Sequence, residues 1–436
     1  MTMTRRRFVH ATSATLGAMA LGTRSTQDWQ RLRVDGDRLN QHLDDLSQFG
    51  RTAEGGVHRV AFSDADIEAR RFCLELMSRA GLDARIDAAG NVVGRRPGLL
   101  ADAPPIVFGS HIDTVPDGGK YDGSLGSLSA IEIAETLREN GYRNRRPLEV
   151  VIFSDEESGL SGSSGFVGAL SREALAGRRS NGPTLAECIE RIGGDPARIE
   201  EAARHPGEIA GYIELHIEQG ATLERAGIQI GVVEGIVGIT RHDVVFAGFP
   251  NHAGTTPMSE RRDAMLAAAE LVLAVNRQVR AIPGRQVGTV GRLEAEPNAP
   301  NVIPGRVTLT VELRDLSNET IDRLWEGIAR EAQEIAQRQG ASVSHERTSR
   351  IEPALADPGI RGVIADAAAD MGLSTLSLPS GAGHDAQELA RIGPMGMLFV
   401  PSVGGVSHSP LEFTRPEDVV NGANVLLQSV LRLDRQ

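Results

Sequence analysis

The sequence is poor in cysteine, in aromatic residues and in positive charge. Its 436 residues include two cysteines, Cys73 and Cys188, which excludes a disulfide framework. We expect two reduced, buried thiols, with one bridge between them as the alternative. The 46 Lys and Arg against 58 Asp and Glu give a net charge of -12, and no basic run follows the N-terminus. This balance argues against nucleic acid and anionic membranes as partners.

The chain also lacks an apolar run long enough to span a bilayer, so we expect no stable membrane association. Residues 1–27 differ from the rest, because the basic stretch TRRRFVH at residues 4–10 precedes an uncharged, small-residue run at residues 11–22. This arrangement resembles a twin-arginine signal, with a disordered basic tail as the alternative. We therefore expect a bacterial protein that the twin-arginine export machinery delivers to the periplasm or otherwise exports.

The rest of the chain alternates short apolar runs with helical patterns. Buried strands are predicted where apolar runs lead into polar, glycine-bearing loops, at residues 106–108, 148–153, 209–215 and 395–400. Helices are predicted at residues 64–81, with Asp64 as N-cap, and at 127–140, 357–371 and 416–431. This alternation is typical of an α/β fold with a mainly parallel sheet, in which ligands bind beyond the carboxyl ends of the strands.

Residues 236–350 follow a different order. Strands are predicted at 240–247, 286–293, 306–313 and 342–347, and helices at 261–281 and 319–339. The resulting βαββαβ order is ferredoxin-like. We interpret residues 236–350 as an inserted lid and dimerisation domain, 28–235 plus 351–436 as the catalytic domain, and 1–27 as the signal segment.

Histidines and acids gather in five loops, four of which directly follow a predicted strand. The residues are His111, Asp113 and Asp122 in GSHIDTVPDGGKYDG, Glu156 and Glu157 in FSDEESG, His216 and Gln219 in ELHIEQG, His384 in SGAGHDA, and His408 in VGGVSHSP. A lone histidine is more often structural than a ligand, and an acidic triplet is usually a solvated turn. Their joint placement at the ends of parallel strands nevertheless predicts a pair of divalent cations, which would neutralise the crowded carboxylates.

The order of these motifs resembles the family of N-carbamoyl-L-amino-acid hydrolases, allantoate amidohydrolases and β-ureidopropionases, part of the dinuclear-metal aminoacylase and carboxypeptidase clan. The resemblance covers about residues 35–432 and extends to NHAGTTPM, EPNAPNVIPG and PSVGGVSHSP. The chain departs from the family after Glu157, where a Gly-x-Arg-Phe-like run is usual and SGLS stands at residues 158–161.

The resemblance implies a centre of two divalent metal ions per subunit. One ion would be held by His111, Asp122 and His216, and the other by Asp122, Glu157 and His408. Asp113 would orient the imidazole of His111. We expect zinc, and manganese, cobalt or nickel also accept such ligands.

The implied reaction is hydrolysis of the ureido C–N bond of N-carbamoyl-L-amino acids or related ureido acids, releasing ammonia and CO2. Glu156 would be the general base, and histidine at position 216 marks the ureido-cleaving branch. His252 would stabilise the oxyanion in the partner subunit of a homodimer. The implied substrate contacts are Gln219, Asn301, Arg314, Gly383 and His384.

Other readings stay open at this point. Allantoate amidohydrolase and β-ureidopropionase are alternative activities, followed by aminoacylase or dipeptidase of the same clan. A non-catalytic binding protein on this fold is disfavoured by the intact ligand set and Glu156. Arg314 has the alternative of a surface salt bridge at a strand end.

Overall fold

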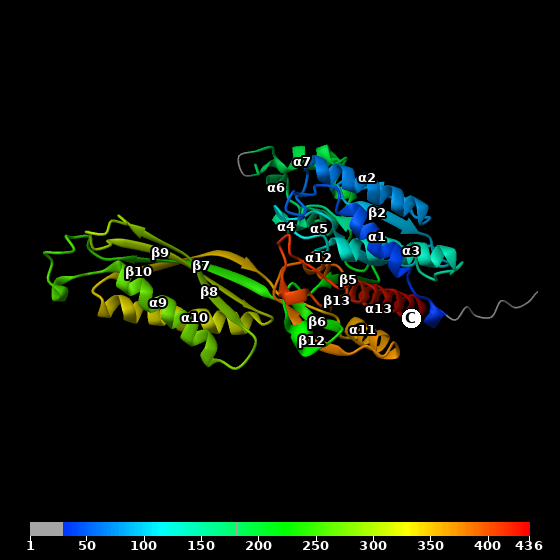
Figure 1. The fold of residues 1–436 in the computed structure, drawn as a ribbon. Helices are drawn as coiled ribbons and strands as arrows, with labels where there is room; N and C mark the ends of the chain where they lie inside the picture. Colours follow the sequence, from blue (N-terminus) through cyan, green and yellow to red (C-terminus); the bar gives the residue numbers. More distant parts are fainter. Residues whose placement is uncertain (1–28, 180–181) are drawn as a thin grey trace, which may run out of the picture.

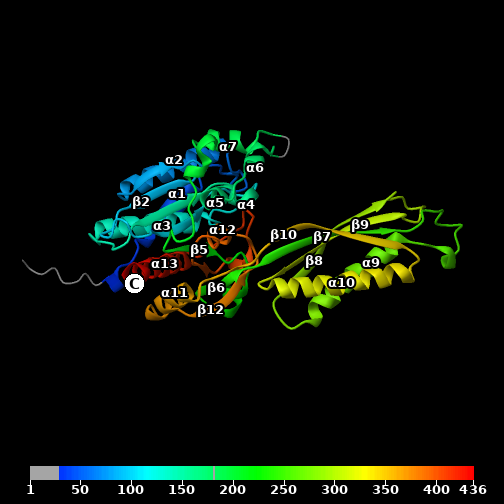
Figure 2. The same ribbon diagram turned by 180° about the vertical axis from the view of Figure 1, so that it is seen from behind.

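The structure is a computed structural model that describes residues 29–179 and 182–436, so the expected signal segment lies outside the described residues. The chain forms two bodies, a larger one around a nine-stranded sheet and an elongated one around a four-stranded sheet (Figures 1 and 2). Among the described residues, no helix has both the length and the apolar character that a membrane crossing requires.

The larger sheet has the strand order β1-β2-β4-β3-β5-β13-β6-β11, and β12 pairs with β6. Its central strands β4, β3, β5 and β13 run parallel to one another, which confirms the predicted mainly parallel sheet. The bounds are β1 Asp83–Ile86, β2 Val92–Arg96, β3 Ile106–His111, β4 Leu148–Phe153, β5 Gly211–Ile217, β6 Ile230–Ile236, β11 Ala354–Leu355, β12 Thr375–Ser380 and β13 Met395–Val400.

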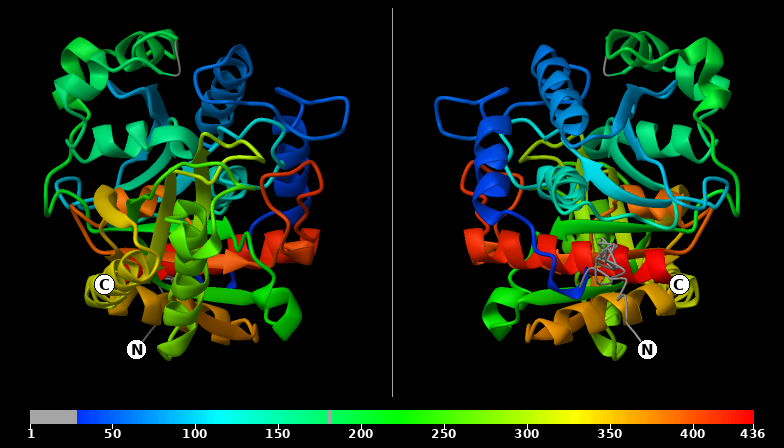
Figure 3. Two further views of the ribbon diagram at one scale, coloured as in Figure 1. Left: turned by 90° about the vertical axis from the view of Figure 1, so that its left-hand side faces the viewer. Right: turned by 90° about the vertical axis from the view of Figure 1, so that its right-hand side faces the viewer.

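Helices cover both faces of this sheet, as the end-on views of Figure 3 show. Alternate strand residues enter different cores: Phe108 packs with the longer helices, and Val107 packs on the opposite face. The first core includes α1 (Gly36–Leu46), α2 (Asp64–Arg79), α3 (Ser124–Glu139), α11 (Pro358–Asp370) and α13 (Pro416–Arg435), and the second α5 (Ser161–Phe166) and α12 (Asp385–Leu389). The shorter helices are α4 (Glu156–Gly159), α6 (Arg172–Ala176), α7 (Leu185–Arg191) and α8 (Thr222–Ala226).

Two local predictions can be compared directly with these elements. The expected N-cap Asp64 is wrong, because Asp64 is already the first residue of α2 and the Ser63 side chain accepts the Asp66 N–H at 3.2 Å. The cysteine prediction is confirmed, since Cys73 and Cys188 are both buried and free.

The elongated body has the strand order β10-β7-β9-β8, with every neighbouring pair antiparallel. Helices α9 and α10 pack on one face, where Phe246, Leu309 and Ile328 join one core. This is the predicted ferredoxin-like order. The bounds are β7 Gly238–Ala247, α9 Ala264–Ala281, β8 Val287–Glu296, β9 Arg306–Asp315, α10 Asn318–Arg338 and β10 Ser342–Ile351.

Candidate active site

The polar residues predicted after the strands meet at the carboxyl ends of β3, β4, β5 and β13. His111 is the last residue of β3, and Glu156 begins α4 three residues after the end of β4. His216 lies inside β5 rather than beyond it, because the pairing with β13 continues to Ile217 opposite Val400. The predicted strand was therefore too short at this end.

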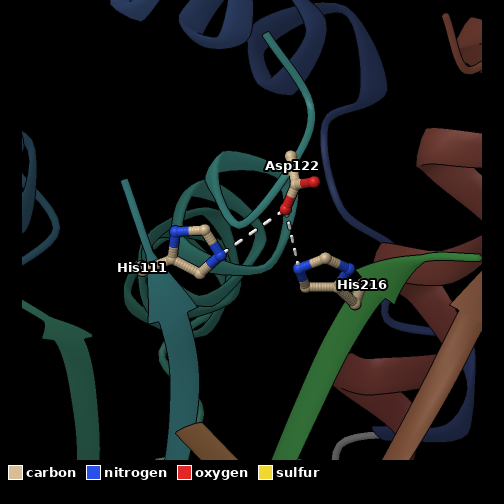
Figure 4. A group of neighbouring side chains, drawn as sticks. All are labelled: His111, Asp122 and His216. Carbon is tan, nitrogen blue, oxygen red and sulfur yellow. Dashed lines mark ion pairs between the residues drawn. The ribbon is translucent and has the colours of Figure 1, made fainter. Parts of the chain in front are cut away.

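Asp122 lies between two buried imidazoles, His111 and His216 (Figure 4). Its Oδ1 is 3.5 Å from Nε2 of His111 and 3.2 Å from Nε2 of His216. Each Nδ1 lies 3.0 Å from a main-chain oxygen, that of Asp113 or Ile217, so Nδ1 carries the proton. The Nε2 atoms of both rings therefore face Asp122, in the orientation that metal-binding imidazoles adopt.

The second oxygen of Asp122 belongs to another group. Oδ2 is 3.4 Å from Nε2 of His408, and that Nε2 is 3.4 Å from Oε2 of Glu157. His408 has a left-handed backbone, with φ of 53°. Such a conformation is costly for a residue other than glycine and is common at ligand sites.

Both groups fit a divalent cation. In each, the three candidate ligand atoms lie within 4.8 Å of one another. Nε2 of His111 and Oε1 of Glu157 are buried and have no hydrogen-bond partner among the described residues, so a cation would satisfy them. A third group, Glu214 with His216 and His384, is as compact, but the Glu214 carboxylate already accepts from Ser110, Tyr212 and Ala386.

Glycines let the loop after β3 approach these side chains. A Cβ on Gly123, whose φ is 62°, would lie 2.3 Å from Nε2 of His111. A Cβ on Gly119 would lie 2.0 Å from Oε1 of Glu412. Any side chain at either position would collide with the site.

Asp113 connects two of the loops. Its Oδ1 is 3.7 Å from Nδ1 of His111, but that nitrogen bonds to the main-chain oxygen of Asp113 instead. The Asp113 carboxylate accepts the main-chain N–H groups of Glu156 and Glu157 at 3.3 and 3.2 Å. Asp113 thus holds the start of α4 against the end of β3.

Burial dominates the electrostatics of the acids. It raises the pKa of Glu156 well above its ordinary value and that of Glu157 to about 7. For Asp122, burial is outweighed by the surrounding imidazoles, His216 first, and the pKa falls well below its ordinary value. A carboxylate with a raised pKa beside one that stays ionised is suited to accepting a proton.

A cavity of about 260 Å³ opens on these residues and is also lined by Leu160, Gln219, Arg314, Gly383 and His384. Gln219 donates to Oδ2 of Asp122 at 2.7 Å. Burial lowers the pKa of His384 well below its ordinary value, so this imidazole is neutral. Arg314 lines the cavity and also pairs with Glu312 at 2.8 Å. The predicted substrate contact and the alternative salt bridge at a strand end are therefore compatible.

Two predicted site residues, His252 and Asn301, do not line this cavity. They adjoin each other, since the Ala253 N–H donates to the main-chain oxygen of Asn301 at 2.9 Å. The β7–β9 ladder runs from Gly238 opposite Asp315 to Ala247 opposite Arg306, and both residues lie beyond its second end. Such a ladder is about 30 Å long, which separates them from their own chain's cavity.

The sequence interpretation missed Glu412. Its Oε1 accepts the main-chain N–H groups of Tyr121 and Asp122 at 2.9 and 3.1 Å. The Ser407 hydroxyl lies 2.9 Å from both Oε2 of Glu412 and Oδ2 of Asp122. The available signal was a lone acid between the apolar residues of PLEF, which is weak without the fold.

Known proteins resemble this chain in sequence and in fold. The model of peptidase family M20/M25/M40 matches residues 107–432. An N-carbamoyl-L-amino acid amidohydrolase of Geobacillus stearothermophilus is 42% identical, covering 92% of this chain and 99% of that protein. An allantoate amidohydrolase of Bacillus subtilis is 35% identical, with coverages of 93% and 99%. The crystal structure of a hydantoinase/carbamoylase family amidase from Burkholderia multivorans superposes with a TM-score of 0.87 at 36% identity, over 93% of this chain and 99% of that one.

The Glu412 contacts generate a first prediction. Glu412→Ala leaves two buried N–H groups without their acceptor and loosens the loop of Asp122. We expect the affinity for Zn²⁺ to fall by about 10- to 100-fold, the usual effect of losing a group that supports a metal ligand. Competition with a chromophoric chelator measures it. The exposed Glu417→Ala is the control, and an unchanged affinity in Glu412→Ala would contradict the prediction.

Proposed function

The chain belongs to peptidase family M20/M25/M40, and we propose that it hydrolyses the carbamoyl C–N bond of N-carbamoyl-L-amino acids. The observation that carries the proposal is the Glu156 carboxylate beside two candidate cation-binding groups that share Asp122. The amidohydrolase of Geobacillus stearothermophilus supports it, since the similarity spans nearly the whole of both chains. Allantoate is the alternative substrate, which the Bacillus subtilis relative supports.

The proposed centre holds two divalent ions per subunit. His111, Asp122 and His216 would bind one, and Asp122, Glu157 and His408 the other. Imidazole and carboxylate ligands suit zinc first, and manganese, cobalt and nickel also. Bound cations of this kind lower the pKa of water and polarise a carbonyl group.

The protein's own groups would then carry the proton. Glu156 accepts a proton from the attacking water, whose oxygen bonds to the carbamoyl carbon. As the C–N bond breaks, Glu156 returns the proton to the departing nitrogen, and the remaining carbamate decomposes to ammonia and CO2. Arg314 suits the substrate carboxylate, because its fork donates two parallel hydrogen bonds. Gln219, Gly383 and His384 would hold the ureido group in the cavity they line.

A panel of N-carbamoyl-L-amino acids, N-carbamoyl-β-alanine, allantoate, N-acetyl amino acids and dipeptides tests the proposed function. We expect more ammonia release from the N-carbamoyl-L-amino acids than from any other compound of the panel. Turnover of N-acetyl amino acids or dipeptides alone would instead point to an aminoacylase or dipeptidase. Glu156→Gln is the matched control, since it removes only the proton acceptor. It should keep two metals per chain and lose about 10²- to 10⁴-fold in turnover.

We further propose a homodimer in which residues 236–350 serve as lid and dimerisation domain. Helix α9 exposes Leu266 and Leu273, seven residues apart and so on one helix face. Strand β8 is an edge strand of its sheet and exposes Val287 and Leu293. Apolar groups and a free edge in this position favour pairing with a second copy. A partner would bring its own His252 and Asn301, which lie far from their own cavity.

Co-expression of His252→Ala with Glu156→Gln tests action across the dimer. Each variant alone should be inactive. In a random heterodimer, one of the two sites has both intact residues, so at most about one quarter of wild-type activity returns. If His252 acts within its own chain, every site of the heterodimer lacks either His252 or Glu156, and no activity returns. No recovery in verified heterodimers would exclude the shared site.

Export to the periplasm through the twin-arginine route is likewise proposed, on the basis of TRRRFVH at residues 4–10. Replacing both Arg5 and Arg6 by Lys keeps the charge and removes the guanidinium groups. We expect the precursor to stay in the cytoplasm, as measured by fractionation. Unchanged periplasmic recovery of the variant would contradict this route.

A further inference from the structure

The short turn after β4 carries three residues that line the cavity. Glu156, Glu157 and Leu160 all lie within residues 155–161. The turn also begins with Asp155, whose buried carboxylate requires a positively charged partner.

That charge comes from Arg179, a residue outside the turn. Its Nη1 and Nη2 donate to Oδ2 and Oδ1 of Asp155 at 2.5 and 2.7 Å, a bidentate pair. The Asp155 side chain is 0% exposed, while that of Arg179 is 28% exposed. The Arg179 guanidinium also lies 5.2 Å from the ring centre of Phe62. Two parallel hydrogen bonds and an aromatic contact fix its position.

Asp155 in turn holds the two ends of the turn together. Its Oδ2 accepts from the Ser161 hydroxyl at 2.8 Å, and the Gly162 N–H donates to the Ser154 main-chain oxygen at 2.9 Å. Asp155 and Leu160 both have left-handed backbones, with φ of 60° and 53°. Such backbones persist only where surrounding contacts enforce them.

We propose that Arg179 is a positioning residue, which fixes Glu156 and Glu157 in the site through its pair with Asp155. A buried carboxylate without a partner is unfavourable, so loss of the guanidinium would release the turn. The proposal rests on the proposed function only for the roles of Glu156 and Glu157. Metal affinity tests the pair without any substrate.

Four variants test the proposal in the full-length protein. Arg179→Met removes the charge and keeps most of the side-chain volume, and Arg179→Lys keeps the charge without the fork. Arg178→Met is the matched control, because Arg178 is exposed and its Nη1 donates to the main-chain oxygen of Gly182 at 3.2 Å, away from Asp155. Asp155→Asn combined with Arg179→Met removes the buried charge together with its partner. The readouts are the Zn²⁺ dissociation constant from chelator competition, the melting temperature, and kcat and KM.

We expect Arg179→Met to weaken Zn²⁺ binding and lower kcat, each by about 10- to 100-fold, with KM nearly constant. Arg179→Lys should lose less, and the double variant should recover much of the metal affinity. Arg178→Met should behave as wild type. A lower melting temperature with unchanged metal affinity and kcat would reduce the pair to a structural contact and overturn the proposal. Absence of ureido hydrolysis in wild type, with the metal-affinity pattern intact, would overturn the proposed function instead.

Discussion

The site depends on one constraint: each of its buried carboxylates requires an opposite charge or hydrogen-bond donors nearby. Asp122 is surrounded by three imidazoles, and Asp113 accepts two main-chain N–H groups. Glu412 accepts main-chain N–H groups from the loop of Asp122. Asp155 pairs with the guanidinium of Arg179. These contacts link loops that are separate in the sequence, so the acids that crowd the site also determine its shape.

The parallel sheet decides which loops can meet. β3 lies between β4 and β5, and β13 lies beyond β5, so four strand ends present their residues on one edge. The pairing of Ile106 with Leu148 sets the register that places His111, and the pairing of Met395 with Tyr212 sets the register that places His216. The helices over both faces bury the apolar side chains of these strands. Residues from distant segments of the chain thereby lie close to one another at this edge of the sheet.

The sequence was most informative where a residue type has a chemical role of its own. His111, Asp122, His216 and His408 were predicted as neighbours, and the structure brings them together. The central strands were predictable from their apolar runs, whereas β1 and β11 are too short for a periodic pattern. Glu412 and Arg179 could not be found, because an acid or arginine acquires such a role only through a distant partner. Neither the spacing of residues in the sequence nor its composition indicates that Arg179 pairs with Asp155.

The inserted segment leaves and rejoins the larger sheet at nearly the same place. β6 ends at Ile236 just before β7, β10 ends at Ile351 just before β11, and Ile239 pairs with Ile351 across the two strands. A polypeptide module whose entry and exit are adjacent can be gained, exchanged or deleted without rerouting the host chain. A short reverse turn in its place would leave the nine-stranded scaffold topologically complete. The inserted segment can therefore vary in sequence and length while the strand order that brings His111, Asp122 and His216 together is retained.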